Sequence, residues 1–179
     1  MNLPNKLTVL RVCMVPVFVF LMLWNGLGAA GKYAAAAIFI LASATDYLDG
    51  YLARKNNLVT DFGKFMDPIA DKLLVCSAMI CLVEKDALAA WIVIIIIGRE
   101  FIISGFRLVA SDKGTVIAAS YWGKFKTVFQ MVMVILLILD LGGIFDTIAQ
   151  IVIWIALILT VVSLVDYLRK NWGVLDGEM

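Results

Sequence analysis

The sequence predicts an all-α integral membrane protein that crosses the bilayer six times. Hydrophobic residues make up 63% of the 179 residues and the mean hydropathy is +0.99, whereas soluble domains are about half apolar. The apolar residues form runs of roughly 17 to 25 residues, each long enough to cross a hydrocarbon core of about 30 Å. Among the 15 Lys and Arg residues, only Lys32 and Lys85 fall in the loops of one side. The positive-inside rule therefore predicts that both termini are cytoplasmic.

Three predicted helices fall in the first half of the chain. A short interfacial segment, residues 1–6, precedes the first helix, and the alternative for that helix is a signal peptide cleaved among the small residues that follow it. Alanines in the second helix permit close packing in lipid, and the polar residues 54–62 connect it to the third. We expect these helices over Leu7–Trp24, Lys32–Ala53 and Gly63–Val83.

Three more helices are predicted in the second half. The fourth helix is apolar except for Arg99, Glu100 and Arg107, and the last helix is followed by a polar tail. No linker, low-complexity segment or internal repeat divides the chain, so we expect one membrane domain over residues 1–179. The helices are expected over Ala87–Ala110, Phe125–Leu141 and Ile144–Leu168.

The composition excludes several kinds of chemistry. The chain has no histidine, so Ser-His catalysis and His-ligated metals are unavailable to it. Its three cysteines, Cys13, Cys76 and Cys81, lie in apolar runs without C-x-x-C spacing and are predicted to be free, buried thiols. Nothing in the charge pattern indicates a nucleic-acid surface.

Acidic and small residues share one face on each of two consecutive helices. The second helix carries such a set at i, i+3, i+4 and i+7, and the third at i, i+4 and i+8, and both spacings place the members on one helical stripe. Two helices joined by a short loop can bring the four carboxylates together, and carboxylate oxygens suit Mg²⁺, Mn²⁺ or Ca²⁺. The two sets are Asp46, Asp49, Gly50 and Ala53, then Gly63, Asp67 and Asp71.

The depth of these acids in the membrane also indicates a function. Asp46 follows Lys32 by about 21 Å of helix, which places it inside the bilayer below the cytoplasmic interface. Acids at that depth are costly, and a functional role is the default expectation. Salt bridges to nearby basic residues are the alternative, but they do not explain why small residues share the same faces.

The complete pattern is D-x-x-D-G-x-x-A-R, eight residues, then G-x-x-x-D-x-x-x-D, and it begins at Asp46. It resembles the signature of the CDP-alcohol phosphotransferase family at every defined position. The resemblance implies an integral membrane enzyme that moves a phosphatidyl-type group from a CDP-linked donor to an alcohol. Family members are commonly homodimers, so a homodimer is expected.

The resemblance also implies roles for the residues of the pattern. Asp71 would act as the general base, and the small residues would line a cytidine pocket, with Arg54 on a donor phosphate. The ligands of two divalent ions, Mg²⁺ or Mn²⁺, would be Asp46, Asp49, Asp67 and Asp71. The site for the CDP-linked donor would contain Asp46, Gly50, Ala53, Arg54 and Gly63.

Two further groups near the pattern have open assignments. Asp61 lies just before the third helix and is either its N-cap or part of the donor site. Asn5, Thr8 and Arg11 recur every three residues on the first helix. They either anchor that helix at the interface or lie at the edge of the donor lipid's phosphate, and Thr8 and Arg11 are carried forward as donor-site candidates.

A second set of polar residues suggests a place for an anionic acceptor. Arg107, Lys124 and Lys126 favour an anion pocket, since guanidinium and ammonium groups that face a cavity bind phosphate. Arg99 is a weaker candidate for the same pocket. Glu100 is predicted to pair with a basic residue of a neighbouring helix.

Three segments resemble the branch of the family that makes phosphatidylglycerophosphate in bacteria, namely residues 2–11, 98–100 and 123–127. This resemblance implies CDP-diacylglycerol as donor, sn-glycerol 3-phosphate as acceptor, and a bacterial plasma-membrane enzyme whose active site faces the cytoplasm. An inositol phosphate or serine remains possible as the acceptor. A divalent-cation transporter is the alternative from another class, although the expected broken helices and repeats are missing from the sequence.

Overall fold

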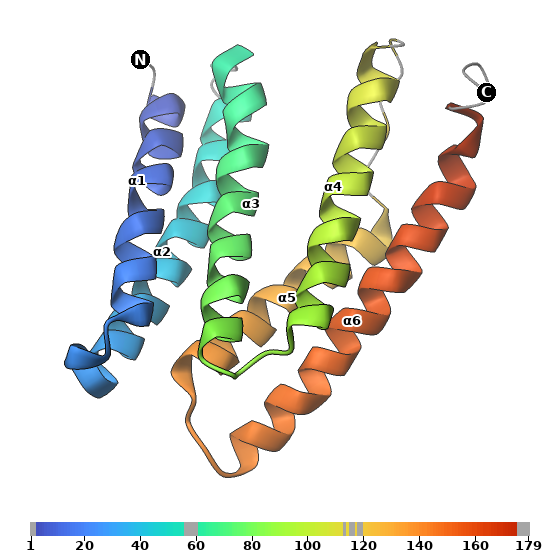
Figure 1. Cartoon of the computed structure of the whole chain (residues 1–179). Coiled ribbons are helices and arrows are strands. Elements are labelled where there is room, and N and C mark those ends of the chain that lie inside the picture. The colour runs from blue at the N-terminus through green and yellow to red at the C-terminus, as the bar shows by residue number, and fades with distance from the viewer. Residues whose placement is uncertain (1–2, 56–60, 113, 115–116, 118–119, 175–179) are drawn as a thin grey trace. The chain divides into compact units, whose positions relative to one another are not determined.

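The computed structural model describes residues 3–55, 61–112, 114, 117 and 120–174, and this part of the chain forms helices and no strand (Figure 1). The all-α class with six long helices is therefore confirmed. Single turns of 3₁₀ helix, Asn25–Leu27 and Trp172–Val174, follow the first and last helices. The long helices are α1 (Leu3–Leu23), α2 (Gly28–Lys55), α3 (Asp61–Glu84), α4 (Ala90–Asp112), α5 (Tyr121–Leu139) and α6 (Ile144–Asn171).

Four of these helices are long and apolar enough to cross a membrane. They contain the spans Lys6–Leu23, Gly28–Thr45, Tyr121–Leu139 and Ile144–Asn171. The helices α3 and α4 have similar lengths, but their charged residues are not confined to the helix ends: α3 contains Asp71 and Lys72, and α4 contains Arg99, Glu100 and Arg107. The chain is thus a multi-pass membrane protein, while the cytoplasmic position of its termini stays a prediction.

The described helices group into two compact units. The first unit contains the chain up to Leu88 together with Val134–Asp140, and the second contains Ala89–Met133 and the chain from Leu141 onward. The helix α5 thus contributes its last residues to the first unit and the rest to the second. The single-domain assignment for residues 1–179 stays a prediction.

In the first unit, α1 packs against both α2 and α3 (Figure 1). The rings of Phe18 on α1 and Phe39 on α2 have centroids 6.0 Å apart and are fully buried. Small buried residues, including Ala35 and Ala42, allow the helices to approach closely. The alanine-rich part of α2 therefore has the packing role that the sequence predicted.

In the second unit, α4 packs against α6. Trp91 and Trp154 form a ring contact with centroids 6.2 Å apart. Large apolar side chains such as Ile94 and Ile158 remain exposed on the two helices, as expected for surfaces that face lipid rather than water.

Two turns in the first unit lie at the end opposite the signature pattern. The helix α3 ends in a Schellman turn, in which the N–H of Ala87 donates to the carbonyl of Leu82 (2.9 Å) and Asp86 has a left-handed φ of 56°. Asp140, which follows α5, has a φ of 43°. The ammonium of Lys32 donates to its carbonyl (3.1 Å) and to its carboxylate (3.2 Å).

The cysteines are only partly as predicted. None of the three is in a disulfide, and Cys81 is buried, but Cys76 is only half-buried and Cys13 is exposed on α1. The prediction of a buried thiol was wrong for Cys13 because a membrane helix can turn apolar residues outward to lipid, so an apolar run does not identify the buried face.

Candidate active site

The backbone brings the two halves of the signature pattern to one end of the first unit. The first half lies in the last turns of α2 and the second half in the first turns of α3. Only residues 56–60 separate these helices, so the end of α2 and the start of α3 must be close in space. The side chains of Asp46, Asp49, Asp67 and Asp71 lie outside the described part, and the two-metal site stays a prediction. Among the described side chains no other group of three acidic or cysteine residues could hold a metal ion.

The side chains of Arg54 and of the small residues of the pattern also lie outside the described part of the chain. Their positions on α2 and α3 are described, but the side chains of Ala53, Arg54 and Asp61 are not. Since α3 begins at Asp61 rather than Gly63, this acid lies at a helix N-terminus, where a carboxylate is favourable. Both interpretations of Asp61 therefore stay open.

Two polar residues of α1 are completely buried in the first unit. Thr8 is 0% exposed and Arg11 is 1% exposed, and α1 packs against the two helices that carry the aspartates. A residue that anchors a helix at the membrane interface would face the headgroups instead. A buried guanidinium is costly unless anionic groups face it, so the burial of Arg11 disfavours the anchoring interpretation.

A cavity of about 670 Å³ in the first unit is not the predicted site. It lies between the end of α1, the start of α2 and the end of α3, with Trp24, Lys32 and Asp140 in its lining. Asp46 is fourteen residues further along α2 than Lys32, or about 21 Å. The cavity is therefore at the opposite end of these helices from the signature pattern.

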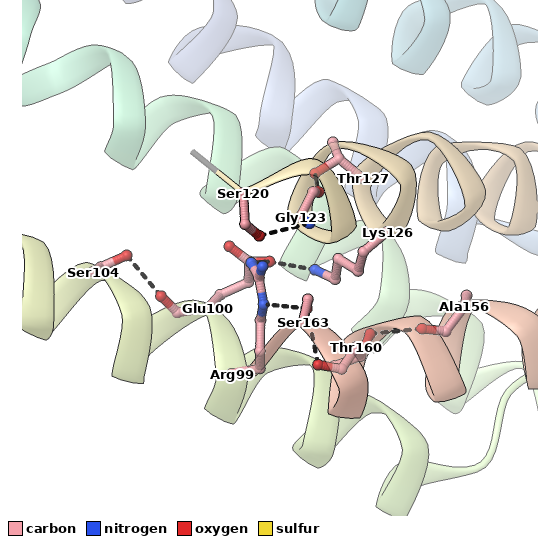
Figure 2. A network of polar contacts seen from close by, with 10 residues as sticks. All are labelled: Arg99, Glu100, Ser104, Ser120, Gly123, Lys126, Thr127, Ala156, Thr160 and Ser163. Atoms are coloured by element: carbon pink, nitrogen blue, oxygen red, sulfur yellow. Dashed lines mark hydrogen bonds and ion pairs between the residues drawn. The ribbon is translucent and has the colours of Figure 1, made fainter. Parts of the chain in front are cut away.

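The second unit contains a buried polar network (Figure 2). The carboxylate oxygen Oε1 of Glu100 accepts from Nη1 of Arg99 (3.0 Å) and from the ammonium of Lys126. Lys126 is 1% exposed and belongs to α5, while Glu100 belongs to α4. Glu100 thus pairs with a basic residue of another helix, as the sequence predicted.

A serine that the sequence analysis missed fixes the orientation of Arg99. The Nε of Arg99 donates to the hydroxyl of Ser163 on α6 (3.1 Å), and that hydroxyl donates to the carbonyl of Thr160 (3.0 Å), as Figure 2 shows. Thr160 and Ser163 are spaced i, i+3 and are both 0% exposed. Two hydroxyls at helical spacing in an apolar helix are the signal that could have found them, because polar groups in lipid-embedded helices need partners.

The network brings together two of the segments that resemble the phosphatidylglycerophosphate branch of the family. Residues 98–100 supply Arg99 and Glu100, whereas residues 123–127 supply Lys126 and a glycine that lies against the arginine. A Cβ atom at Gly123 would be 3.1 Å from Nη2 of Arg99. The two segments are therefore parts of one arrangement in space.

The other two basic residues predicted for the acceptor lie on aromatic rings. The guanidinium carbon of Arg107 is 5.9 Å from the ring centroid of Tyr167, and the ammonium of Lys124 is 5.4 Å from that of Tyr121. The structure thus brings Arg99 and Lys126 together at Glu100 and places Arg107 and Lys124 at separate tyrosines. Neither tyrosine was predicted, since an aromatic residue in an apolar helix gives no distinct signal.

Comparisons with known proteins identify similar chains. Residues 1–162 match the family model of the CDP-alcohol phosphatidyltransferases. The CDP-diacylglycerol–glycerol-3-phosphate 3-phosphatidyltransferase of Bacillus subtilis is 46% identical over 187 residues, which cover 97% of each chain. The protein of the same name from Rickettsia typhi is 43% identical over 142 residues, or 79% of each chain. A probable phosphatidylglycerophosphate synthase of Mycobacterium tuberculosis is 42% identical over 170 residues, which cover 94% of this chain and 81% of the relative.

Proposed function

Because the chain belongs to the CDP-alcohol phosphatidyltransferase family, we propose that it transfers the phosphatidyl group of CDP-diacylglycerol to sn-glycerol 3-phosphate. The products are phosphatidylglycerophosphate and CMP. The observation that carries this proposal is the 46% identity, over 97% of both chains, to a relative whose name states these substrates. The enzyme class follows from the family, and the acceptor follows from the names of the relatives.

In the proposed reaction, Asp71 accepts the proton of the acceptor's primary hydroxyl. The oxygen then attacks the phosphorus that carries the diacylglycerol, a new P–O bond forms, and the P–O bond to CMP breaks. The backbone supports this assignment because α2 and α3 bring the halves of the pattern to the same end of the first unit.

A set of four carboxylates fits a hard divalent ion such as Mg²⁺ or Mn²⁺. Members of this family are generally dependent on divalent metals. Two such ions would stabilise negative charge on the pyrophosphate and on the departing CMP. Their proposed ligands are Asp46, Asp49, Asp67 and Asp71.

The donor is proposed to lie in the first unit. The small residues of the pattern leave room for the cytidine, and the buried guanidinium of Arg11 favours a phosphate near α1. The proposed donor site consists of Asp46, Gly50, Ala53, Arg54, Asp61 and Gly63, with Thr8 and Arg11.

The acceptor's phosphate is proposed to bind in the second unit. Arg99 and Lys126 are held by the same carboxylate of Glu100, which supports a shared role in recognising an anion. Arg107 and Lys124 complete the proposed set from positions on α4 and α5. We further propose that the enzyme is a homodimer in the bacterial plasma membrane with its active site facing the cytoplasm.

The test is CMP release from CDP-diacylglycerol by detergent-purified protein. The reaction is run with Mg²⁺ or Mn²⁺ and a panel of acceptors: glycerol 3-phosphate, inositol 1-phosphate, myo-inositol and serine. We expect release with glycerol 3-phosphate alone, and we expect EDTA to abolish it because the carboxylate site would lose its ions.

The other results distinguish the alternatives. Release with a different acceptor would keep the phosphatidyltransferase reaction and reject glycerol 3-phosphate. Folded protein that releases no CMP with any acceptor would reject the proposed reaction, and uptake of Mn²⁺ by proteoliposomes would then test cation transport.

A further inference from the structure

The cavity in the first unit has no role in the proposed reaction. Its volume of about 670 Å³ is within the range of pockets that hold organic molecules in proteins, roughly 300 to 1,000 Å³. Three of the four segments that line it are helix ends, and the fourth is a helix start. These segments are the ends of α1 (Leu23), α3 (Glu84) and α5 (Leu139) and the start of α2 (Gly28).

The cavity lies at the level of the lipid headgroups. The apolar span of α1 ends at Leu23, that of α2 starts at Gly28 and that of α5 ends at Leu139. All three limits lie beside the cavity, which is therefore at the boundary of the hydrocarbon core. Trp24 in its lining is 55% exposed and its ring contacts that of Phe20, with centroids 4.4 Å apart. Tryptophan is enriched at this level of the membrane.

The lining of the cavity is amphipathic. Met22, Leu82 and Ile138 form an apolar wall and are each at most 3% exposed. The rest of the lining carries charges of both signs, which suits an amphiphile that has an anionic and a cationic group. The charged residues are two lysines and three acids, namely Lys32, Lys85, Glu84, Asp86 and Asp140.

Charges of both signs remain available to a ligand. Lys32 and Asp140 pair with each other at 3.2 Å. By contrast, Glu84, Lys85 and Asp86 are exposed and form no ion pair within the part of the chain that the structure describes. The cavity therefore offers two carboxylates and one ammonium group on the turn that follows α3.

The helix ends add partial negative charge to the same space. The last carbonyls of a helix have no partner within it, and the helix dipole is negative there. None of the three helices that end at the cavity has a basic residue in its last turn. The ammonium of Lys32 donates to the carbonyl of Asp140 (3.1 Å), so one wall of the cavity already binds an alkylammonium group of the chain itself.

A bare metal ion fits this lining less well than an organic cation. Among the described side chains, no group of three acidic or cysteine residues could hold a metal ion. The ammonium of Lys85 repels a ligand that has positive charge alone, but it attracts the phosphate of a ligand that has both charges.

We propose that the cavity binds the headgroup of a zwitterionic aminophospholipid, phosphatidylethanolamine, from the membrane surface opposite the signature pattern. The ammonium of the lipid donates to the carboxylates of Glu84 and Asp86, and its phosphate accepts from Lys85. The apolar wall contacts the glycerol and the first acyl carbons. This site is separate from the proposed reaction, because Lys32 in its lining is fourteen residues from Asp46, or about 21 Å.

The test measures the midpoint of thermal unfolding of the detergent-purified protein in micelles with increasing amounts of lipid. Dilauroyl phosphatidylethanolamine should raise the midpoint at lower mole fractions than dilauroyl phosphatidylglycerol, because only the first lipid carries an ammonium group. The double variant Glu84→Gln/Asp86→Asn should need about tenfold more phosphatidylethanolamine for the same shift, since it loses two exposed ion pairs. Asparagine also tolerates the φ of 56° at residue 86.

The control for this loss of charge is Asp146→Asn. It removes an exposed carboxylate from the first turn of α6, outside the lining of the cavity. Its response to phosphatidylethanolamine should match that of the unchanged protein.

A change at Lys85 separates a zwitterion from a simple cation. Lys85→Gln should weaken the response to phosphatidylethanolamine about threefold, because the phosphate loses an ion-pair partner. A ligand with positive charge alone would instead bind more tightly to this variant, since a repulsive ammonium is removed. If the double variant does not fold, Lys85→Gln decides the question by the sign of its effect.

Four results would overturn the lipid site. The first is an equal response to the two lipids, and the second is an unchanged response in the double variant. The third is a stronger response to phosphatidylethanolamine in Lys85→Gln, which would assign the cavity to a cation. The fourth is the same shift with soluble glycerophosphoethanolamine at equal concentration, which would assign it to a soluble molecule.

Discussion

At the scale of single residues, Asp71 offers the sharpest test of the proposed chemistry. It occupies the last position of the signature pattern, on α3, and is proposed to accept the proton of the acceptor's hydroxyl. Asp71→Asn should lower kcat by about 10² to 10⁴, because an amide cannot take that proton, while CDP-diacylglycerol still binds. The measurement is kcat together with equilibrium binding of the donor.

The control for this change is Asp112→Asn, at the exposed end of α4 and outside the pattern. It should leave kcat unchanged. If Asp71→Asn kept near-normal turnover, another group would have to be the base. If it lost donor binding as well as turnover, Asp71 would act mainly through the metal ions.

Single residues also mark the limit of what the sequence could predict about the site. The pairing of Glu100 with a basic residue of another helix was predictable, because a buried acid requires a partner. The role of Ser163 was not, since its partner Arg99 is 64 residues away in the chain. Gly123 was visible only as part of a segment, because its significance depends on the arginine that lies against it.

At the scale of the elements, the helices were predictable but their first residues were not. The helix α1 begins at Leu3 instead of Leu7 because a proline, here Pro4, is tolerated in the first turn. The helix α5 begins at Tyr121 rather than Phe125, where Ser120 supplies the cap. Both starts depend on the residues of the first turn, which the apolar periodicity does not record.

The turn after α3 gives a prediction about stability. Asp86 has a φ of 56° at the position of a Schellman turn that glycine usually occupies. Asp86→Gly should therefore stabilise the protein by about 0.5 to 1 kcal/mol, because glycine adopts this conformation without a steric penalty. The measurement is the midpoint of thermal unfolding in detergent, which should rise.

Two related variants control for this explanation. Asp86→Ala should lower the midpoint, since alanine keeps the steric penalty and loses the polar side chain that tolerates it. Asp140→Gly should gain less than Asp86→Gly, although Asp140 also has a positive φ, because it loses the ion pair with Lys32. A lower midpoint for Asp86→Gly would show that its carboxylate makes a stabilising interaction that outweighs the backbone strain.

At the scale of the whole molecule, the predicted orientation can be measured by chemical labelling. In a variant whose three native cysteines are replaced by serine, Lys85→Cys and Arg169→Cys each provide one exposed thiol. The positive-inside rule predicts that Lys85→Cys reacts with a membrane-impermeant maleimide in intact cells, whereas Arg169→Cys reacts only after permeabilisation. The reverse pattern would place the signature pattern on the outer side and rule out a cytoplasmic active site.

The whole-molecule organisation was the least predictable part of the fold. Apolar runs and their boundaries are local properties of the sequence, which is why six helices could be expected. The division of α5 between two units, at Met133 and Val134, depends on contacts with helices far away in the chain. No single-sequence pattern records those contacts, and one continuous apolar helix gives no sign of the division.

The ion pair between Lys32 and Asp140 has a consequence for biogenesis. Its partners are 108 residues apart in the chain, and residues 134–140 complete a unit whose other members end at Leu88. When the ribosome has delivered only the first three helices to the membrane, Lys32 has no Asp140 to bind and the unit lacks its last segment. The signature pattern is therefore synthesised before residues 134–140, which complete the unit that contains it.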